Sequence, residues 1–254
     1  MEEDLYSRFA RKCKDIASKQ LHHWKTDPSI QYMLEHETKA NAELYVAQIL
    51  DDGGMSLSDV QRIASCNDRF GNSQLHSFVD GSIRCSTSSL RYLKHAYDIM
   101  QLLRSKSVAK VQVVEIGGGY GGLCLIMQHL AAHFNVEISN YIIYDLPEVA
   151  QLQKYYLDQN RAAEIVSWGD SASCGGDIAE RVQANSHLLI TSNYCLSEIP
   201  ESLRLQYIEN VLKRAESVYM RWNWGDKGCL PPNLTIVPEI PDTSHGNGNT
   251  IITL

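Results

Sequence analysis

Residues 113–127 read VVEIGGGYGGLCLIM, with five glycines in the six positions from 117 to 122 between two apolar runs. The first run predicts a buried strand and the second predicts a helix, so the glycines occupy the turn between them. Glycine has no Cβ and readily adopts positive φ, which lets a ligand approach main-chain N–H groups at the tip of a strand. A simple glycine-rich hinge would not need such strongly patterned flanks. The stretch therefore predicts a cofactor site in an α/β fold.

Short β-branched runs alternate with helical patterns from Val108 onward, which predicts a parallel sheet with crossover helices. The expected strands are VQVVEI (111–116), YIIYD (141–145), EIVSW (164–168), HLLITSN (187–193) and SVYMRWN (217–223). The expected helices lie at 122–133, after Pro147, at 178–184 and at 200–214. At the C-terminal end, LTIVPEIP (234–241) and NTIITL (249–254) flank a Gly-Asn-rich turn and predict an antiparallel hairpin at one edge of the sheet.

The N-terminal part predicts helices rather than strands. Helical patterns occur at 5–17, at 30–50, after Ser56 and at 87–105. Ser56 with Asp59 three residues later resembles a capping box. Periodicity disappears between Cys66 and Cys85, which predicts a long loop of the kind that often forms lids or binding segments. We therefore expect a helical region with a substrate-covering loop at 1–106 and a cofactor-binding domain at 107–254.

Composition narrows the classes of partner. The 254 residues carry a formal net charge of -7 without a block of like charge, which disfavours nucleic acid and anionic membranes. The seven cysteines are scattered and never form a C-x-x-C pair, which argues against a disulfide framework or a structural zinc site. No apolar run approaches the roughly 20 residues of a membrane span. We expect a soluble, cytoplasmic protein without membrane insertion.

Two cofactor classes are compatible with the glycine stretch. Gly117, Gly119 and Gly122 satisfy the G-x-G-x-x-G pattern of dinucleotide sites. However, Glu115 lies two residues before the first glycine, where a carboxylate can approach the cationic amino acid end of S-adenosylmethionine. Asp145 also comes later than the spacing of about 20 residues expected for a dinucleotide. The sequence therefore favours S-adenosylmethionine.

At this point the sequence resembles a known family. The segments EIGGGYGGL, YDLPEV, SNYCLSE and EIP…GN, preceded by GNSQLHSF and SLRYLK, are similar to those of sugar O-methyltransferases from glycan biosynthesis. The resemblance covers approximately residues 67–254. It implies a Rossmann-like class I methyltransferase sheet, mostly parallel with a C-terminal antiparallel hairpin, and an N-terminal helical extension.

The resemblance also implies a cofactor site. The expected S-adenosylmethionine-binding residues are Glu115, Gly117, Gly118, Gly119, Gly121, Asp145, Leu146, Trp168, Asp170, Ser192 and Asn193. Among these, Glu115 and the glycines would face the methionine portion, and Asp145 would accept hydrogen bonds from the ribose hydroxyls. Asp170 would reach the adenine amino group, with Trp168 or Leu146 covering the base. Asp170 can equally be an ordinary helix cap.

We expect chemistry above the fourth and fifth strands of the sheet, where polar residues follow apolar runs. The expected substrate-binding residues are Tyr120, Tyr194, Trp222 and Asn223, with Trp224 as a further aromatic surface for a pyranose face. Each polar residue can instead simply satisfy loop backbone groups. The sugar oxygen would attack the sulfonium methyl group of S-adenosylmethionine, S-adenosylhomocysteine would leave, and a base would take the proton of the hydroxyl.

The candidate bases are Glu198, His245 and His76. We prefer Glu198, because it lies just past the fourth strand and just before Pro200, which suits the first turn of a helix. An acidic residue near a helix N-terminus can also be stabilised there without a catalytic role, and a lone histidine is more often structural. The sequence shows no compact ligand cluster, so we expect no metal.

The expected substrate is a nucleotide sugar or a glycan residue, with a deoxyhexose such as rhamnose as the first candidate. Two alternatives stay open. One is a methyltransferase for phenolic small molecules, which would need a deep apolar pocket, and the other is a catalytically silent member that binds S-adenosylmethionine or a partner. The exposed helical stripes would also support a homodimer.

Overall fold

The structure is a computed structural model that describes residues 4–183, 186–244 and 248–254. The chain forms two compact units, each assembled from three separate stretches. Unit 1 comprises residues 1–100, 119–134 and 148–164, and unit 2 comprises residues 101–118, 135–147 and 165–254. The chain passes from unit 2 to unit 1 inside the glycine stretch, between Gly118 and Gly119.

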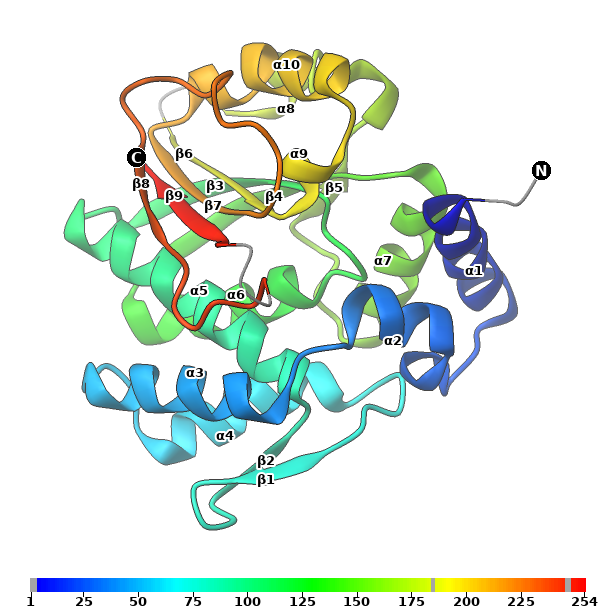
Figure 1. Cartoon of the computed structure of the whole chain (residues 1–254), viewed down its shortest axis with the longest axis vertical. Coiled ribbons are helices and arrows are strands. Elements are labelled where there is room, and N and C mark those ends of the chain that lie inside the picture. Colours follow the sequence, from blue (N-terminus) through cyan, green and yellow to red (C-terminus); the bar gives the residue numbers. More distant parts are fainter. Residues whose placement is uncertain (1–3, 184–185, 245–247) are drawn as a thin grey trace. The chain divides into compact units, whose positions relative to one another are not determined.

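Unit 2 is built on a mostly parallel seven-stranded sheet within the described residues (Figure 1). Its strands are β3 (Lys110–Ile116), β4 (Glu137–Tyr144), β5 (Val166–Trp168), β6 (His187–Asn193), β7 (Ser217–Trp222), β8 (Thr235–Pro238) and β9 (Thr250–Thr253). Their spatial order is β5-β4-β3-β6-β7-β9-β8, with β9 antiparallel to both β7 and β8. The predicted Rossmann-like sheet with a C-terminal antiparallel hairpin is confirmed.

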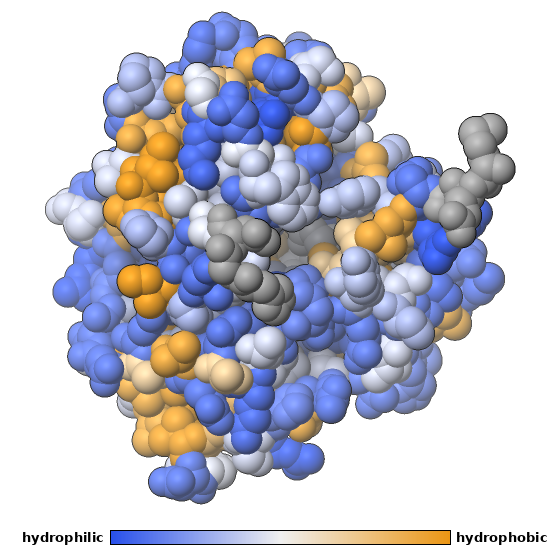
Figure 2. All heavy atoms as spheres, viewed as in Figure 1, coloured by the Kyte–Doolittle hydropathy of each residue, from blue (hydrophilic) through white to orange (hydrophobic). Residues whose placement is uncertain are grey.

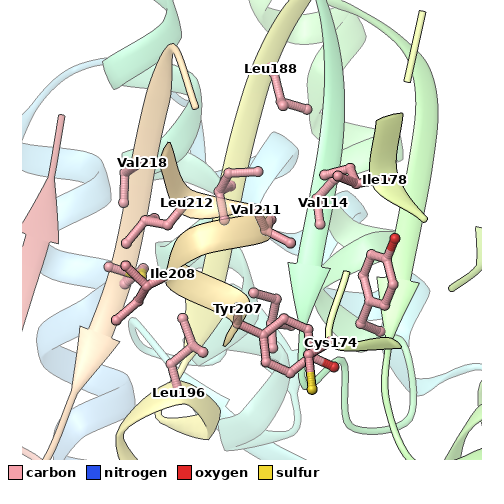
Figure 3. Packing of buried hydrophobic residues seen from close by; sticks show 14 of the residues in the cluster. Val114, Cys174, Ile178, Leu188, Leu196, Tyr207, Ile208, Val211, Leu212 and Val218 are labelled. Atoms are coloured by element: carbon pink, nitrogen blue, oxygen red, sulfur yellow. The ribbon is translucent and has the colours of Figure 1, made fainter. Parts of the chain in front are cut away.

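One face of this sheet packs against the helices of unit 2. These helices are α8 (Ile178–Arg181), α9 (Cys195–Glu198) and α10 (Glu201–Asn210), followed by the 3₁₀ turn η5 (Leu212–Arg214). Val114 and Val218 from the sheet pack with Tyr207, Ile208 and Leu212 in one buried cluster (Figure 3). Burial of such apolar side chains is the main force that holds the helices on the sheet. α9 is a short element that the sequence patterns did not predict.

The strand β8, at one edge of the sheet, leaves apolar side chains exposed. All four residues of β8 are exposed, and Ile236 and Val237 keep 45% and 43% of their accessible surface. Hydrophobic side chains gather over β8 on the left of the space-filling view (Figure 2). β8 lies at one edge of the sheet, and its last residue, Pro238, has no N–H to offer to a further strand.

Unit 1 is mainly helical and also contains the β1–β2 hairpin. Its helices are α1 (Leu5–Lys19), α2 (Pro28–Leu34), α3 (Lys39–Asp51), α4 (Leu57–Ala64), most of α5 (Thr87–Ser105), α6 (Gly122–Ala131) and all but the first residue of α7 (Pro147–Gln159). Ser56 caps α4 as predicted, because Asp59 N donates to Ser56 Oγ at 3.2 Å, and Asp59 Oδ2 accepts the Ser56 hydroxyl at 2.7 Å instead of the backbone N–H that a capping box would use. The expected N-terminal helices are thus present.

Two expectations for unit 1 are wrong in detail. The pattern at 30–50 is two helices rather than one, because Thr38 caps a new helix by accepting Asn41 N at 3.1 Å. The segment 66–85 is not a plain loop, since it contains the antiparallel strands β1 (His76–Phe78) and β2 (Ile83–Cys85). Strands of three residues are too short to show a period-2 pattern, so the sequence carried little signal for this hairpin.

Candidate cofactor and substrate site

The glycine turn follows β3 at the carboxyl edge of the sheet. Gly117 has φ +79°, and its N–H donates to Tyr144 O at 2.9 Å. A Cβ on Gly117 would lie 2.2 Å from the Cβ of Cys195, so no larger residue fits there. Gly119 and Gly121 also have positive φ, at +54° and +94°. The conformation of the turn, together with the packing of Gly117, accounts for glycine at these positions, and Gly118 completes the turn.

Glu115 is a buried carboxyl group next to this turn. Its side chain is on β3, only 2% of the residue's surface is exposed, and it accepts a hydrogen bond from Tyr141 Oη at 2.8 Å. Burial raises the pKa of Glu115 to about 8, the Tyr141 hydrogen bond opposes this rise, and the charge of Asp145 adds to it. A carboxyl group in this setting favours its neutral form until a cation comes close.

The residues expected at the ribose and adenine follow the neighbouring strands β4 and β5. Asp145 comes directly after β4, is half-buried, and accepts Leu146 N at 2.8 Å through Oδ1. The Leu146 side chain is exposed, whereas Trp168 at the end of β5 is half-buried. Asp170 caps a 3₁₀ turn by accepting Ala172 N at 2.9 Å. Asp170 therefore has the capping role that the sequence also allowed.

Two polar residues end β6, the neighbour of β3 on its other side. Ser192 is buried and already fully engaged, because its Oγ donates to Ile116 O at 2.9 Å and accepts Leu196 N at 3.2 Å. Asn193 differs, since its buried Oδ1 has no hydrogen-bond partner among the described residues. A buried acceptor without a partner is costly, which makes Asn193 a candidate to receive a donor from a ligand.

Glu198 is held by Asn223 at the same edge. Asn223 follows β7, and its Nδ2 donates to Glu198 Oε1 at 2.6 Å. The Ser197 hydroxyl in turn donates to Asn223 Oδ1, which fixes the orientation of the amide. Glu198 is the last residue of the helix α9, and the side chain that orients it comes from Asn223, just after the strand β7. The sequence placed both residues at this edge but did not predict their contact.

Tyr194 is anchored by a buried ion pair that the sequence patterns did not reveal. Its hydroxyl donates to Glu239 Oε1 at 2.7 Å, and Glu239 pairs with Arg221, both side chains being completely buried. Burial raises the pKa of Glu239, but the Arg221 charge together with hydrogen bonds from Tyr194, Asn249 and Thr243 outweighs it, so the net pKa is lowered. Tyr194 also has φ +69°, an uncommon conformation for a residue with a side chain. Such backbone strain concentrates at functional sites.

The candidate aromatic surfaces differ in accessibility. Tyr120 and Trp222 are completely buried, so neither ring offers a face to a sugar. Trp224 keeps 74% of its surface exposed and is the accessible ring of the three. Sequence patterns could not separate these cases, because they report residue type and spacing rather than the depth of a side chain.

The structure describes one of the two remaining candidate bases. His76 is in β1 of unit 1, where it lines a polar pocket with Glu35 and Glu37. His245 lies outside the described residues. Within the ranges that the structure describes, no group of three or more His, Cys, Asp and Glu side chains is arranged to hold a metal ion.

Two further features of the described chain do not involve the predicted site. A groove of about 460 Å³ runs along α10, with Leu205, Lys213 and Cys229 among its lining residues, and none of the expected site residues lines it. A membrane span would need a longer and more apolar helix than any that the described residues form.

Comparisons with known proteins give only distant structural likeness. No model of a known protein family and no curated protein matches this chain. An O-methyltransferase family protein from Burkholderia thailandensis aligns with a TM-score of 0.40 at 11% identity, over 65% of this chain and 59% of its own. The MTase domain of METTL16 aligns with a TM-score of 0.45 at 14% identity, over 78% of this chain and 79% of its own. TrmK of M. capricolum, solved with S-adenosyl-homocysteine, aligns with a TM-score of 0.39 at 10% identity, over 61% of this chain and 66% of its own. Likeness at this level does not bear on activity.

Proposed function

We propose that this chain is an S-adenosylmethionine-dependent O-methyltransferase that methylates a sugar hydroxyl. The observation that carries the proposal is the buried carboxyl group of Glu115 beside the glycine turn. A buried carboxylate needs a cation or several donors to compensate its loss of hydration. S-adenosylmethionine offers an ammonium and a sulfonium group, whereas the pyrophosphate of a dinucleotide would add negative charge. The unpartnered Oδ1 of Asn193 offers the ammonium a second acceptor.

The residues at the edge of the unit 2 sheet fit the rest of such a cofactor. The main chain of Gly117 and Gly118 would face the methionine portion, and Asp145 would hold the ribose diol through its carboxylate. Leu146 and Trp168 would cover the adenine, since Leu146 directly follows Asp145 and Trp168 ends β5, the neighbour of β4. When bound, S-adenosylmethionine supplies a methyl group that a weak oxygen nucleophile can attack. Asp170 would contact adenine only through atoms that its capping role leaves available.

The acceptor is proposed to meet Glu198. A sugar hydroxyl is far too weakly acidic to ionise alone at neutral pH, so a base should take its proton during transfer. Asn223 Nδ2 donates to Glu198 Oε1 at 2.6 Å and so orients the carboxylate that would accept the proton. Tyr194 and the exposed Trp224 are the further candidates for hydrogen bonding and stacking with a pyranose.

A homodimer, to which the exposed β8 edge would contribute apolar surface, is part of the same proposal.

Replacement of Glu198 by glutamine tests the base directly. Glu198→Gln keeps the side chain's shape and an oxygen for Asn223 but cannot accept a proton. We expect methyl transfer to a panel of deoxyhexose glycosides to fall about 10²- to 10⁴-fold, with cofactor affinity unchanged in calorimetry. Glu201→Gln, an exposed acid on α10, is the matched control and should keep full turnover. Near-normal turnover of Glu198→Gln, with loss in His76→Ala, would reassign the base to His76.

A further inference from the structure

Arg204, the fourth residue of α10, is a buried cation of unit 2 that the chemistry described so far does not use. Only 7% of the residue's surface is exposed. In the described chain, its guanidinium has one carbonyl and one aromatic ring as partners. Nη1 donates to Ser197 O at 3.3 Å, and Cζ lies 5.6 Å from the centre of the Trp222 ring. The buried Nε has no hydrogen-bond partner among the described residues.

The buried arginine in β7 shows what Arg204 lacks. Arg221 pairs with the Glu239 carboxylate, and both side chains are completely buried. A buried charge without such a partner is costly, because nothing replaces the hydration that it loses. A ring and a single long hydrogen bond to a carbonyl replace only part of it. A further negative group beside Arg204 would complete the compensation.

The guanidinium of Arg204 is held on three sides. Side chains on a helix lean toward its N-terminus, and Arg204 accordingly reaches Ser197, which precedes α10. The loop after β7 covers another side, since a Cβ on Gly225 would lie 2.7 Å from Arg204 Nη1 and 2.5 Å from Ser197 O. Trp222 Nε1 donates to Gly225 O at 2.6 Å and fixes this loop. The fork is therefore rigid at its Nη1 corner.

The edge formed by Nε and Nη2 of Arg204 has no partner in the described chain. Nε is buried, whereas Nη2 is not fully buried, so a ligand can reach this edge. A guanidinium is always charged and offers only donors, so the ligand must accept hydrogen bonds and carry negative charge. Its two parallel N–H groups match two oxygens of a carboxylate or a phosphoryl group.

The start of α10 favours the same ligand. Pro200 at its N-cap position provides no side-chain cap, and the first N–H groups of a helix have no partner within it. The helix dipole also favours negative charge at this end, so a cation such as Arg204 is unfavourable there by itself. An oxyanion would compensate both the dipole and the guanidinium.

Arg204 and Glu198 belong to one hydrogen-bonded group of residues in unit 2. Ser197, whose carbonyl accepts from Arg204, donates its hydroxyl to Asn223 Oδ1. Asn223 Nδ2 in turn donates to Glu198 Oε1 at 2.6 Å. An oxyanion bound at Arg204 would therefore lie beside the residue proposed as the base.

We propose that Arg204 binds an oxyanion of the methyl acceptor, a phosphoryl or a carboxylate group, so that the acceptor is an acidic molecule. The identification of the bound molecule as the acceptor rests on the proposed function, but oxyanion binding itself requires neither cofactor nor turnover. Arg204 selects and orients the acceptor, while Glu198 takes the proton. A phosphoryl group would come from a nucleotide-linked sugar and a carboxylate from an acidic glycan residue.

The Nε–Hε signal of Arg204 in the NMR spectrum of the native full chain tests oxyanion binding without any variant. We expect the signal to shift and saturate with inorganic phosphate or acetate, and not with sodium chloride at the same ionic strength. The anion that saturates the shift at the lower concentration identifies the source as phosphoryl or carboxylate. A signal that follows ionic strength alone would overturn the proposal.

Calorimetry with matched acidic and neutral sugars tests recognition. The pair is L-rhamnose 1-phosphate with methyl α-L-rhamnopyranoside, or methyl α-D-glucuronoside with methyl α-D-glucoside where acetate is the preferred anion. The native chain should bind the acidic sugar about 10- to 100-fold more tightly, the usual effect of a charge-assisted hydrogen bond. Arg204→Met keeps an apolar stem against Trp222 and should abolish this preference, whereas Arg204→Lys should keep part of it. Arg214→Met, an equal change of charge at an exposed position, is the matched control.

Equal affinity of the native chain for both sugars, or an equal loss for both in Arg204→Met, would show a purely structural role and overturn the assignment. Acid-selective binding that depends on Arg204, without methyl transfer to any acceptor, would support the site and remove the proposed function. Methyl transfer to neutral sugars alone would support the proposed function and remove the site. The two failures are therefore distinguishable.

Discussion

A carboxyl group buried without a cation makes a protein less stable when it ionises, and Glu115 is such a group. Its pKa of about 8 lies above the usual 4.5, so the folded chain holds a proton that the unfolded chain has released between these values. The free energy of unfolding of the cofactor-free protein should therefore decrease as pH rises from about 4.5 toward 8. The decrease is at most about 1.4 kcal/mol per pH unit.

Glu115→Gln should remove this pH dependence. In urea unfolding without cofactor, we compare the free energy of unfolding of the variant with that of the native chain. We expect this difference to shift in favour of the variant by about 1–2 kcal/mol when the pH is raised from 6 to 7.5. The same variant should bind S-adenosylmethionine about tenfold more weakly or worse, because the amide cannot compensate a cation. Glu164→Gln, at an exposed position, is the control. A difference in stability that does not change with pH would show that Glu115 does not titrate in this range.

At the scale of single residues, the sequence predicted where a residue lies along the sheet better than how deeply its side chain is buried. The spacing of Glu115, Gly117 and Asp145 was sufficient to place them at one edge of a sheet, because strand ends in a parallel sheet share that edge. It could not show that Tyr120 and Trp222 are buried. Burial of an aromatic ring depends on segments distant in sequence, and one sequence carries no record of those contacts.

At the scale of elements, the Arg221–Glu239 pair joins three strand ends. Arg221 is in β7, Glu239 follows β8, and Tyr194 follows β6. Glu239→Gln would remove the carboxylate that pairs with the buried Arg221, so we expect a loss of about 3–5 kcal/mol in the free energy of unfolding. The double variant Arg221→Met with Glu239→Gln should recover part of that loss.

An exposed ion pair provides the control for this prediction. Lys213 and Glu209 form an i,i+4 pair in which both side chains are more than half exposed. Glu209→Gln should cost less than about 1 kcal/mol. Urea unfolding monitored by circular dichroism measures all three variants. If Glu239→Gln costs no more than Glu209→Gln, the buried pair does not stabilise the strand ends.

The elements of the sheet were predictable because their patterns are strong and repeated. Every strand expected from 111 onward is present, and so is the C-terminal hairpin. The β1–β2 hairpin and the break before α3 were missed. The turn itself carries a sequence signal, because Asp80 and Gly81 are typical turn residues and Gly81 has φ +85°, but the two flanking strands of three residues are too short to show a period-2 pattern.

At the scale of the whole molecule, unit 1 depends on segments that are far apart in sequence. Tyr156 Oη in α7 donates to Asn67 Oδ1 at 2.7 Å, and Tyr120 Oη donates to Glu35 Oε1 at 2.7 Å. A chain that begins near Val108 would lose both acceptors and leave these buried tyrosines without partners. We expect such a chain to lose cooperative thermal unfolding and all turnover. Cooperative unfolding with full turnover would contradict the role given to residues 1–106.

The central claim is that this chain transfers a methyl group from S-adenosylmethionine to a sugar hydroxyl. Incubation of the full chain with isotopically labelled S-adenosylmethionine and two acceptor panels, deoxyhexose glycosides and phenols, followed by mass spectrometry, tests it most directly. The account predicts label on a deoxyhexose glycoside, none on the phenols, and loss of the label in Glu198→Gln. Label on the phenols alone, or no transfer by a protein that binds the cofactor, would contradict it.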